Sequence, residues 1–235
     1  MIEKQNLVLI SGLLCTDELW EHQAERLGDD FNIIYGVNDA SSIEEMAQQT
    51  IQHIDSLEQG ECFHLAGLSM GGYIALEIMQ QCPKRVKTLS LLNTTAHSCD
   101  PKTISARHQA IRLAEQGRFE ALISAFPGMW LSDKSRQSKK LLALEKRMAL
   151  AVGPECYIRQ QHAIMARKDY TSTLVDIQCP TLLIAGQYDR LIQQAQMENL
   201  ARCIHSAKLH LIDSGHVSSI EAPEQVTRLM MEFLS

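Results

Sequence analysis

The sequence lacks any hydrophobic run long enough to cross a membrane, which excludes the commonest kind of integral membrane protein. No apolar stretch approaches the roughly 18 residues of a membrane-spanning helix. The first residues, Met1 to Asn6, lead at once into a strand-like run, so no targeting segment is expected there. Gly-X-Y periodicity, heptads and internal repeats are absent too, which excludes fibrous proteins. We expect a cytoplasmic protein with no membrane partner.

An excess of positive charge is also missing. The 235 residues carry 22 Lys and Arg against 28 Asp and Glu, a net charge of −6. Nucleic-acid binding requires a dense basic patch that neutralises phosphates, so this composition predicts no nucleic-acid partner. The 45% hydrophobic content argues against disorder, and the length suits one large domain or a domain with an insert. A monomer or small homo-oligomer is expected.

Paired cysteine motifs are absent as well. The chain has seven cysteines, an odd number, and no two of them form a Cys-x-x-Cys pair. This spacing fits neither a disulfide framework nor a zinc site, so reduced thiols in packed positions are expected, with no metal centre. The cysteines are Cys15, Cys62, Cys82, Cys99, Cys156, Cys179 and Cys203.

What the sequence does contain is an alternation of short apolar runs and amphipathic stretches. This alternation is typical of an α/β protein whose mostly parallel sheet has helices on both faces. Buried parallel strands form continuous apolar runs, and most of these runs are of that kind. The expected strands are Leu7–Ile10, Asn32–Tyr35, Cys62–Ala66, Thr88–Asn93, Thr181–Ala185 and Lys208–Ile212. The expected helices are Ser42–Leu57, capped by Ser41 or Ser42, Met70–Gln81, Ala195–Cys203 and Pro223–Phe233.

One long stretch interrupts the alternation. Between Cys99 and Asp176 the sequence shows only helical periodicity and no convincing strand. We therefore predict a core formed by residues 1–98 and 177–235, and a helical lid formed by residues 99–176 that covers one edge of the sheet. The helices expected in the lid are Ile104–Glu115, Phe119–Ala125, Lys139–Val152 and Glu155–Ala166.

A Gly-x-Ser-x-Gly motif at Gly67 to Gly71 follows the third expected strand and leads directly into a helix. With glycine near 7% of residues, this pattern arises by chance in roughly one chain in a dozen of this length. Its position between strand and helix makes it more specific, because a tight turn there requires small neighbours and exposes the serine hydroxyl at the carboxyl edge of the sheet. Ser69 is therefore a candidate nucleophile. A glycine-rich packing turn is the alternative.

A serine hydroxyl needs a base to remove its proton, and His216 is the best candidate. It follows the last expected strand, in the loop Ser214–Val217, at the same sheet edge. His97 lies just past a strand, and His205 and His210 flank the last one, so these three are weaker alternatives. His64 lies within a strand. The remaining histidines that we place on helices are His22, His53, His108 and His162.

The base in turn needs a carboxylate that orients it and stabilises the imidazolium. Asp189 follows the fifth expected strand at a carboxyl edge, and the chain order Ser, Asp, His suits this architecture. Asp213, three residues before His216, is a credible alternative, and Asp176 lies at the opposite edge. The developing oxyanion would be bound by the backbone N–H groups of Met70 and Leu13.

Together these segments resemble the α/β-hydrolase superfamily, in particular the small lid-bearing, carboxylesterase-like branch that includes pimeloyl-ester carboxylesterases and enol-lactonases. The resemblance is carried by Leu65–Gly72, by Pro180–Gly186 with Asp189, and by Gly215-His216 followed by Glu221–Glu224. It spans nearly the whole chain. It implies the α/β-hydrolase fold, no metal or organic cofactor, and a small-molecule acyl substrate.

The sequence departs from the family pattern in three places. The usual His-Gly of the oxyanion loop is Ser11-Gly12, so the support of that loop must differ. The usual long turn after the second strand is reduced to Gly36–Ser41, which shortens one wall of the pocket. The chain begins at the strand that normally comes third, so a sheet of about six strands is expected.

The charge is unevenly divided between the two predicted parts. Residues 99–176 carry thirteen Lys and Arg against eight Asp and Glu, a net of +5, whereas the rest carries nine against twenty, a net of −11. A basic lid could steer an anionic ester toward the pocket, although solvated helix faces explain the same count. Met129 and Trp130, in the apolar stretch Phe126–Leu131, are candidates for lining the substrate pocket. Packing of the lid on the core is the alternative role, and Cys15 beside the oxyanion loop is ambiguous in the same way.

The sequence thus predicts a serine hydrolase that cleaves a small carboxylic ester or related acyl substrate through an acyl-enzyme. Two alternatives stay open. The same three residues could serve carbon–carbon cleavage, lyase or lactonase chemistry, or the chain could be a non-catalytic ligand-binding protein. Esters, thioesters, lactones and amides are not distinguished by the sequence, because the geometry of the lid selects among them.

Overall fold

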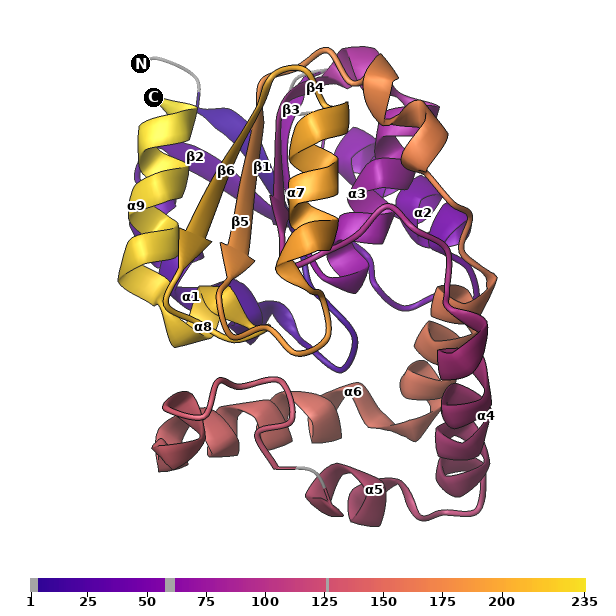
Figure 1. Cartoon of the computed structure of the whole chain (residues 1–235). Coiled ribbons are helices and arrows are strands. Elements are labelled where there is room, and N and C mark those ends of the chain that lie inside the picture. Colours follow the sequence, from indigo (N-terminus) through magenta and orange to yellow (C-terminus); the bar gives the residue numbers. More distant parts are fainter. Residues whose placement is uncertain (1–3, 58–61, 126) are drawn as a thin grey trace.

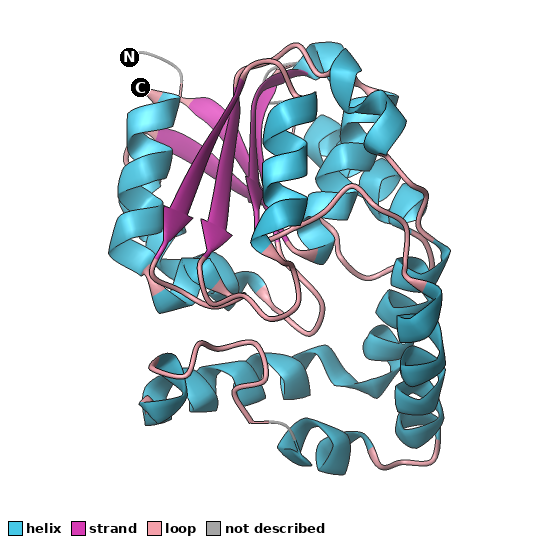
Figure 2. Cartoon of the chain, in the orientation of Figure 1, coloured by secondary structure: helices cyan, strands magenta, loops and turns pink. Residues whose placement is uncertain are grey.

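Six parallel strands form a single sheet in the order β2-β1-β3-β4-β5-β6, with helices on both faces (Figures 1 and 2). The computed structural model describes residues 4–57, 62–125 and 127–235. The strands are β1 (Gln5–Ile10), β2 (Phe31–Tyr35), β3 (Phe63–Leu68), β4 (Val86–Leu92), β5 (Thr181–Gly186) and β6 (Ala207–Ile212). The predicted α/β class and the parallel sheet of about six strands are confirmed.

Burial separates the central strands from the edges. All six residues of β3 and of β5 are buried, as expected for strands covered on both faces. The edge strands β2 and β6 are only partly buried. The prediction that the third strand ends at Ala66 was wrong, because β3 continues to Leu68, which pairs with Leu92 of β4. The extra two residues bring Ser69 to the carboxyl edge of the sheet.

Among the described residues, five helices cover the sheet. Helices α1 (Glu21–Leu27) and α9 (Pro223–Leu234) pack on one face, and α2 (Ile43–Ser56), α3 (Met70–Gln81) and α7 (Gln194–Cys203) lie on the other (Figure 1). Of the two predicted caps of α2, Ser42 is the one used: its hydroxyl accepts the N–H of Glu45 at 3.1 Å. The short helix α8 (Ser218–Glu221) was not predicted, because four residues carry too little periodicity.

The chain between β4 and β5 is helical and lies beyond the carboxyl ends of the strands (Figure 1). It contains α4 (Pro101–Glu115), α5 (Phe119–Ala125) and α6 (Lys139–Ala166), and its described residues form no strand. Helix α6 spans both helices predicted there, but Gly153, with φ of +75°, interrupts it just before Pro154. The carboxyl edge of the sheet therefore faces a layer of helices.

Across the part of the chain that the structure describes, no helix is both long and apolar enough to span a lipid bilayer.

Candidate active site

Ser69 stands in a strained turn between β3 and α3. Its φ of +56° and ψ of −114° lie in a region that side-chain-bearing residues rarely occupy. The turn is possible because glycines lie beside it: a Cβ on Gly71 would overlap the carbonyl oxygen of Ile10, and one on Gly67 would overlap that of Gly71. Thr94, two residues past the end of β4, stabilises the turn, since its hydroxyl donates to the carbonyl oxygen of Ser69 at 2.8 Å.

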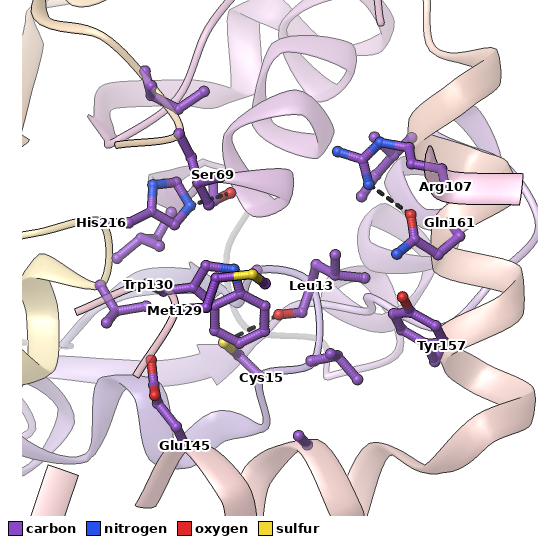
Figure 3. Close-up of a pocket in the computed structure, with 18 of the residues that line it drawn as sticks. Leu13, Cys15, Ser69, Arg107, Met129, Trp130, Glu145, Tyr157, Gln161 and His216 are labelled. Carbon is purple, nitrogen blue, oxygen red and sulfur yellow. Dashed lines mark hydrogen bonds between the residues drawn. The ribbon is translucent and has the colours of Figure 1, made fainter. Parts of the chain in front are cut away.

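Ser69, His216 and Asp189 are joined by two short hydrogen bonds. The hydroxyl of Ser69 lies 2.8 Å from Nε2 of His216, and Nδ1 of His216 lies 2.8 Å from Oδ2 of Asp189. The side chains of His216 and Asp189 are almost fully buried, at 6% and 1% exposure, while Ser69 is half-buried. The three residues come from three separate loops at the carboxyl edge of the sheet, and the structure brings all of them together (Figure 3 shows Ser69 and His216).

The electrostatics of Asp189 fix the tautomer of His216. Burial alone raises the pKa of Asp189, but His216 and the hydrogen bonds donated by Ile192 and Asn93 together hold it below its ordinary value. An ionised carboxylate can only accept hydrogen bonds, so Nδ1 of His216 carries the proton and donates. Nε2 is then an acceptor that faces the hydroxyl of Ser69. This arrangement suits proton abstraction from the serine.

Asn93, which the sequence placed only at the end of a strand, supports both loops of the site. Its amide donates to Oδ2 of Asp189 at 2.9 Å and to the carbonyl oxygen of Gly215 at 3.2 Å. It is fully buried and has a left-handed φ of +47°, a conformation that asparagine tolerates. A polar residue at the carboxyl end of the strand next to β5 was the only signal for this role.

The helical layer also holds the His216 loop in place. The carbonyl oxygen of Trp130 accepts the N–H of His216 at 2.9 Å. Nearby, the carboxylate of Glu221 accepts the N–H of Ser132 at 2.9 Å. The 127–132 segment is therefore bound to the loop that carries the base, which the sequence did not predict.

The expected oxyanion donors lie beside Ser69. Met70 is the first residue of α3, and a Cβ placed on Gly12 would lie 3.4 Å from the Cβ of Ser69, so the loop that carries Leu13 runs next to the serine. Within the described residues, the N–H groups of Leu13 and Met70 donate no hydrogen bond to another protein group. Both N–H groups are therefore available to a ligand.

The oxyanion loop has its own support in place of the missing histidine. The hydroxyl of Ser11 donates to the carbonyl oxygen of Thr16 at 3.0 Å. The side chain of Gln160, on α6, contacts this loop: its Oε1 accepts the N–H of Leu14 at 3.1 Å, and its Nε2 donates to the carbonyl oxygen of Asn38 at 2.9 Å. One buried glutamine thus joins the oxyanion loop, the shortened turn after β2 and the helical layer.

The alternative bases and acids lie in other surroundings. His97 contacts Thr171 at 3.3 Å and Asp169 at 3.6 Å, and Asp213 pairs with Lys134 at 3.3 Å. His64 is buried in β3, where it contacts Thr88 and Gln5. None of these side chains forms a hydrogen bond with Ser69 among the contacts of the described residues. The other three candidates, which also lack such a bond, are His205, His210 and Asp176.

A cavity of about 890 Å³ opens above Ser69, between the sheet edge and the helices. Met129 and Trp130 both line it, and Figure 3 shows them below Ser69, between it and Glu145. Phe126, which begins the apolar stretch proposed for the pocket, lies outside the described residues. The size is that of a pocket for a small molecule.

Two titratable side chains in the cavity have raised pKa values. Cys15 is buried, and burial with the nearby Glu145 raises the pKa of its thiol to about 12, so Cys15 is no thiolate nucleophile. Burial and the neighbouring Glu221 carboxylate raise the pKa of Glu145 to about 7. No group of three or more potential metal ligands occurs among the described His, Cys, Asp and Glu residues.

Comparison with known proteins identifies the family. A family model described as Thioesterase domain matches residues 30–234, which is most of the chain. A protein of Pseudomonas savastanoi pv. phaseolicola, provisionally named carbamate hydrolase RutD, is 30% identical, with 97% of this chain and 93% of that protein covered. The chain belongs to the α/β-hydrolase superfamily.

Further relatives agree with this membership. The 3-oxoadipate enol-lactonase 1 of Acinetobacter baylyi is 25% identical to this hydrolase, over 99% of this chain and 90% of its own length. The structure of a thermophilic esterase from Thermogutta terrifontis superimposes with a TM-score of 0.92 at 25% identity, covering 98% of this chain and 89% of that one. The protein is an α/β-fold hydrolase, as its sequence predicted.

Proposed function

We propose that this hydrolase cleaves small carboxylic esters through an acyl-enzyme formed on Ser69. The observation that carries the proposal is the continuous pair of 2.8 Å hydrogen bonds from Ser69 through His216 to Asp189, at the floor of a cavity. The relatives named as an esterase and an enol-lactonase support ester chemistry, since a lactone is a cyclic ester.

The reaction follows from the positions of these groups. Nε2 of His216 takes the proton as the Ser69 oxygen attacks the ester carbonyl carbon, and the oxyanion accepts hydrogen bonds from the N–H groups of Leu13 and Met70. His216 then gives the proton to the leaving alkoxide, and the ester carbon–oxygen bond breaks. A water molecule, deprotonated by His216, attacks the acyl carbon. The bond from that carbon to the Ser69 oxygen then breaks, and His216 returns the proton to this oxygen as the carboxylic acid product leaves.

Residues 99–176 act in this proposal as a cap on the core formed by residues 1–98 and 177–235. The supporting contacts are the hydrogen bonds of Trp130 to His216 and of Gln160 to the oxyanion loop. Because Met129 and Trp130 also line the cavity, the cap would bound the space for the acyl and alcohol groups. The cap would therefore select the substrate, as the loops around a fixed catalytic centre commonly do.

Replacement of Ser69 tests the proposal. We expect Ser69→Ala to lower kcat/KM for p-nitrophenyl acetate and butyrate by about 10⁴-fold or more, as loss of a serine nucleophile does elsewhere. Mass spectrometry of the wild type should detect a fluorophosphonate adduct on Ser69 that the variant lacks. The matched control is Ser105→Ala, an exposed helical serine, which should behave as the wild type. Full activity of Ser69→Ala would overturn the proposal, and a wild type with neither turnover nor an adduct would favour a non-catalytic ligand-binding protein.

A further inference from the structure

The wall of the cavity across from Ser69 carries two arginines. Tyr157, Gln161 and Ile164 of α6 line the cavity, and their spacing places them on one face of that helix. Arg167, directly after α6, and Arg107 of α4 line it as well. Figure 3 shows Arg107, Gln161 and Tyr157 on the far side of the cavity from His216.

Arg167 is a buried cation without a carboxylate partner. Only 8% of it is exposed, and its guanidinium lies 4.3 Å from the centre of the Tyr73 ring. Its Nε donates to the carbonyl oxygen of His97 at 3.0 Å and its Nη1 to that of Ile164 at 2.8 Å. These contacts fix its position, but carbonyl oxygens leave its charge uncompensated, and within the described chain it forms no salt bridge.

Arg107 is similar. Its Nη1 donates to Oε1 of Gln161 at 2.6 Å, and only 4% of Gln161 is exposed. The Nε of Arg107 is buried and has no hydrogen-bond partner within the described residues. A guanidinium offers five N–H donors, so most of those on this arginine are not used by the protein.

The acidic groups that line the same cavity do not neutralise the two arginines. Asp100 caps α4, where its carboxylate accepts the N–H of Lys102 at 2.9 Å. It lies seven positions before Arg107, about 10 Å along a helix. Glu145 lies near Glu221 and Arg136, toward the His216 side of the cavity. Burying a cation without a counter-charge is unfavourable, so an anion that entered this part of the cavity would gain both charge and hydrogen bonds.

We propose that Arg107 and Arg167 form a subsite for a carboxylate of the substrate, so that the preferred esters carry a free carboxylate away from the ester bond. The inference rests on the proposed function and deepens it by naming a substrate class. Arg167 is fixed by backbone carbonyls and Arg107 by Gln161, so the donors are preorganised. The mostly apolar space between them and Ser69 would hold the carbon chain.

Matched pairs of esters test the subsite. We expect the wild type to prefer the monomethyl esters of succinate, glutarate or adipate over the dimethyl esters, with kcat/KM at least 10-fold higher for the chain length that spans the cavity. Arg107→Gln should lower that ratio of anionic to neutral ester at least 10-fold, and Arg107→Lys should lower it less. A general loss of activity lowers kcat/KM for the anionic and the neutral ester equally, so it leaves their ratio unchanged. Arg112→Gln, an exposed cation on the same helix, should leave the ratio unchanged.

Binding without turnover gives an independent measurement. Glutarate should bind to Ser69→Ala in isothermal titration calorimetry, at least 10-fold more weakly when Arg107→Gln is added, and with the same affinity when Arg112→Gln is added. The subsite would be overturned if no monoester were preferred over its dimethyl ester, or if Arg107→Gln left the affinity for glutarate unchanged. Failure of Ser69 to react with a fluorophosphonate would instead overturn the proposed function, and glutarate binding would still decide the subsite.

Discussion

At the scale of single residues, the three groups proposed to act on the substrate were predictable because each follows a strand. Ser69 comes directly after β3, Asp189 lies in the loop after β5 and His216 in the loop after β6, and parallel strands bring their carboxyl ends to one edge. The residues that position them were not predictable. Asn93 meets Asp189 across 96 positions of sequence, and no local pattern specifies such a pairing.

Asn93 offers a test at this scale. We expect Asn93→Gly to lower kcat for p-nitrophenyl butyrate about 10- to 100-fold, because Asp189 and the Gly215 carbonyl each lose a buried donor, a loss that costs about 1–3 kcal/mol. Glycine retains the left-handed backbone, so the effect reports the amide. Since Asn93 does not line the cavity, KM should change less than about twofold. Loss of folded enzyme would also lower the apparent kcat, so kcat is referred to the concentration of folded protein, measured by urea denaturation of the variant.

Asn199→Ala, on α7 and outside the lining of the cavity, is the control and should leave both constants unchanged. If Asn93→Gly instead raised KM and left kcat intact, Asn93 would have no role in positioning Asp189.

At the scale of elements, the length of a segment decided what the sequence could predict. The ends of the long helices and of the apolar strands were predicted to within a few residues. Their hydrophobic pattern extends over several helical turns, or over the whole length of a strand, and is therefore clear. Helix α8 and the turn-like helices at Asp17–Trp20 and Ser135–Gln137 are too short to show a period. The predicted division of this stretch at Gly153-Pro154 is confirmed, because α6 consists of two helical runs joined across a non-helical Gly153. Proline disfavours helix in the residue before it, which made the break predictable.

The kink in α6 can be tested by replacing its glycine. Gly153 has φ of +75° and ψ of 170°, a region open essentially to glycine alone, although nothing lies within 4 Å of the Cβ it lacks. We expect Gly153→Ala to lower the free energy of unfolding in urea by about 1–3 kcal/mol through backbone strain alone. Glu155→Ala, exposed two residues later, should change it by less than about 0.5 kcal/mol. Equal effects of the two substitutions would show that no strain is present at the kink.

At the scale of the whole molecule, the charge asymmetry between the two parts has a structural outcome. Cations of the 99–176 segment pair with carboxylates of the rest of the chain: Arg147 with Glu18, Arg159 with Asp39, Lys134 with Asp213 and Lys168 with Glu44. The partners are 79 or more positions apart in the sequence. The uneven charge could therefore be counted from the sequence, but the individual ion pairs could not be predicted from it. Some of the positive charges of the 99–176 segment thus form ion pairs that join its helices to the rest of the chain. That this segment steers anionic esters toward the pocket stays a prediction.

One contact between the two parts is repulsive, and it makes stability depend on pH. Burial and the neighbouring Glu221 carboxylate raise the pKa of Glu145 to about 7 from an ordinary 4.5. Arg136 and the backbone N–H groups of Gly128 and Trp130 oppose that rise only in part. Between these two pH values the folded protein keeps a proton that the unfolded chain has lost. The free energy of unfolding therefore falls as the pH rises from 4.5 to 7, and above 7 the loss is complete.

Glu145→Gln should remove this dependence, because glutamine resembles the neutral acid and does not ionise. We expect the variant to exceed the wild type in free energy of unfolding by up to about 3 kcal/mol at pH 8 and by much less at pH 5, as measured by urea denaturation at both values. Glu115→Gln, exposed on α4, is the control and should show no such difference. A gain for Glu145→Gln that was the same at pH 5 and pH 8 would show that this carboxyl keeps its ordinary pKa in the folded protein, and that the two parts meet without electrostatic cost at that contact.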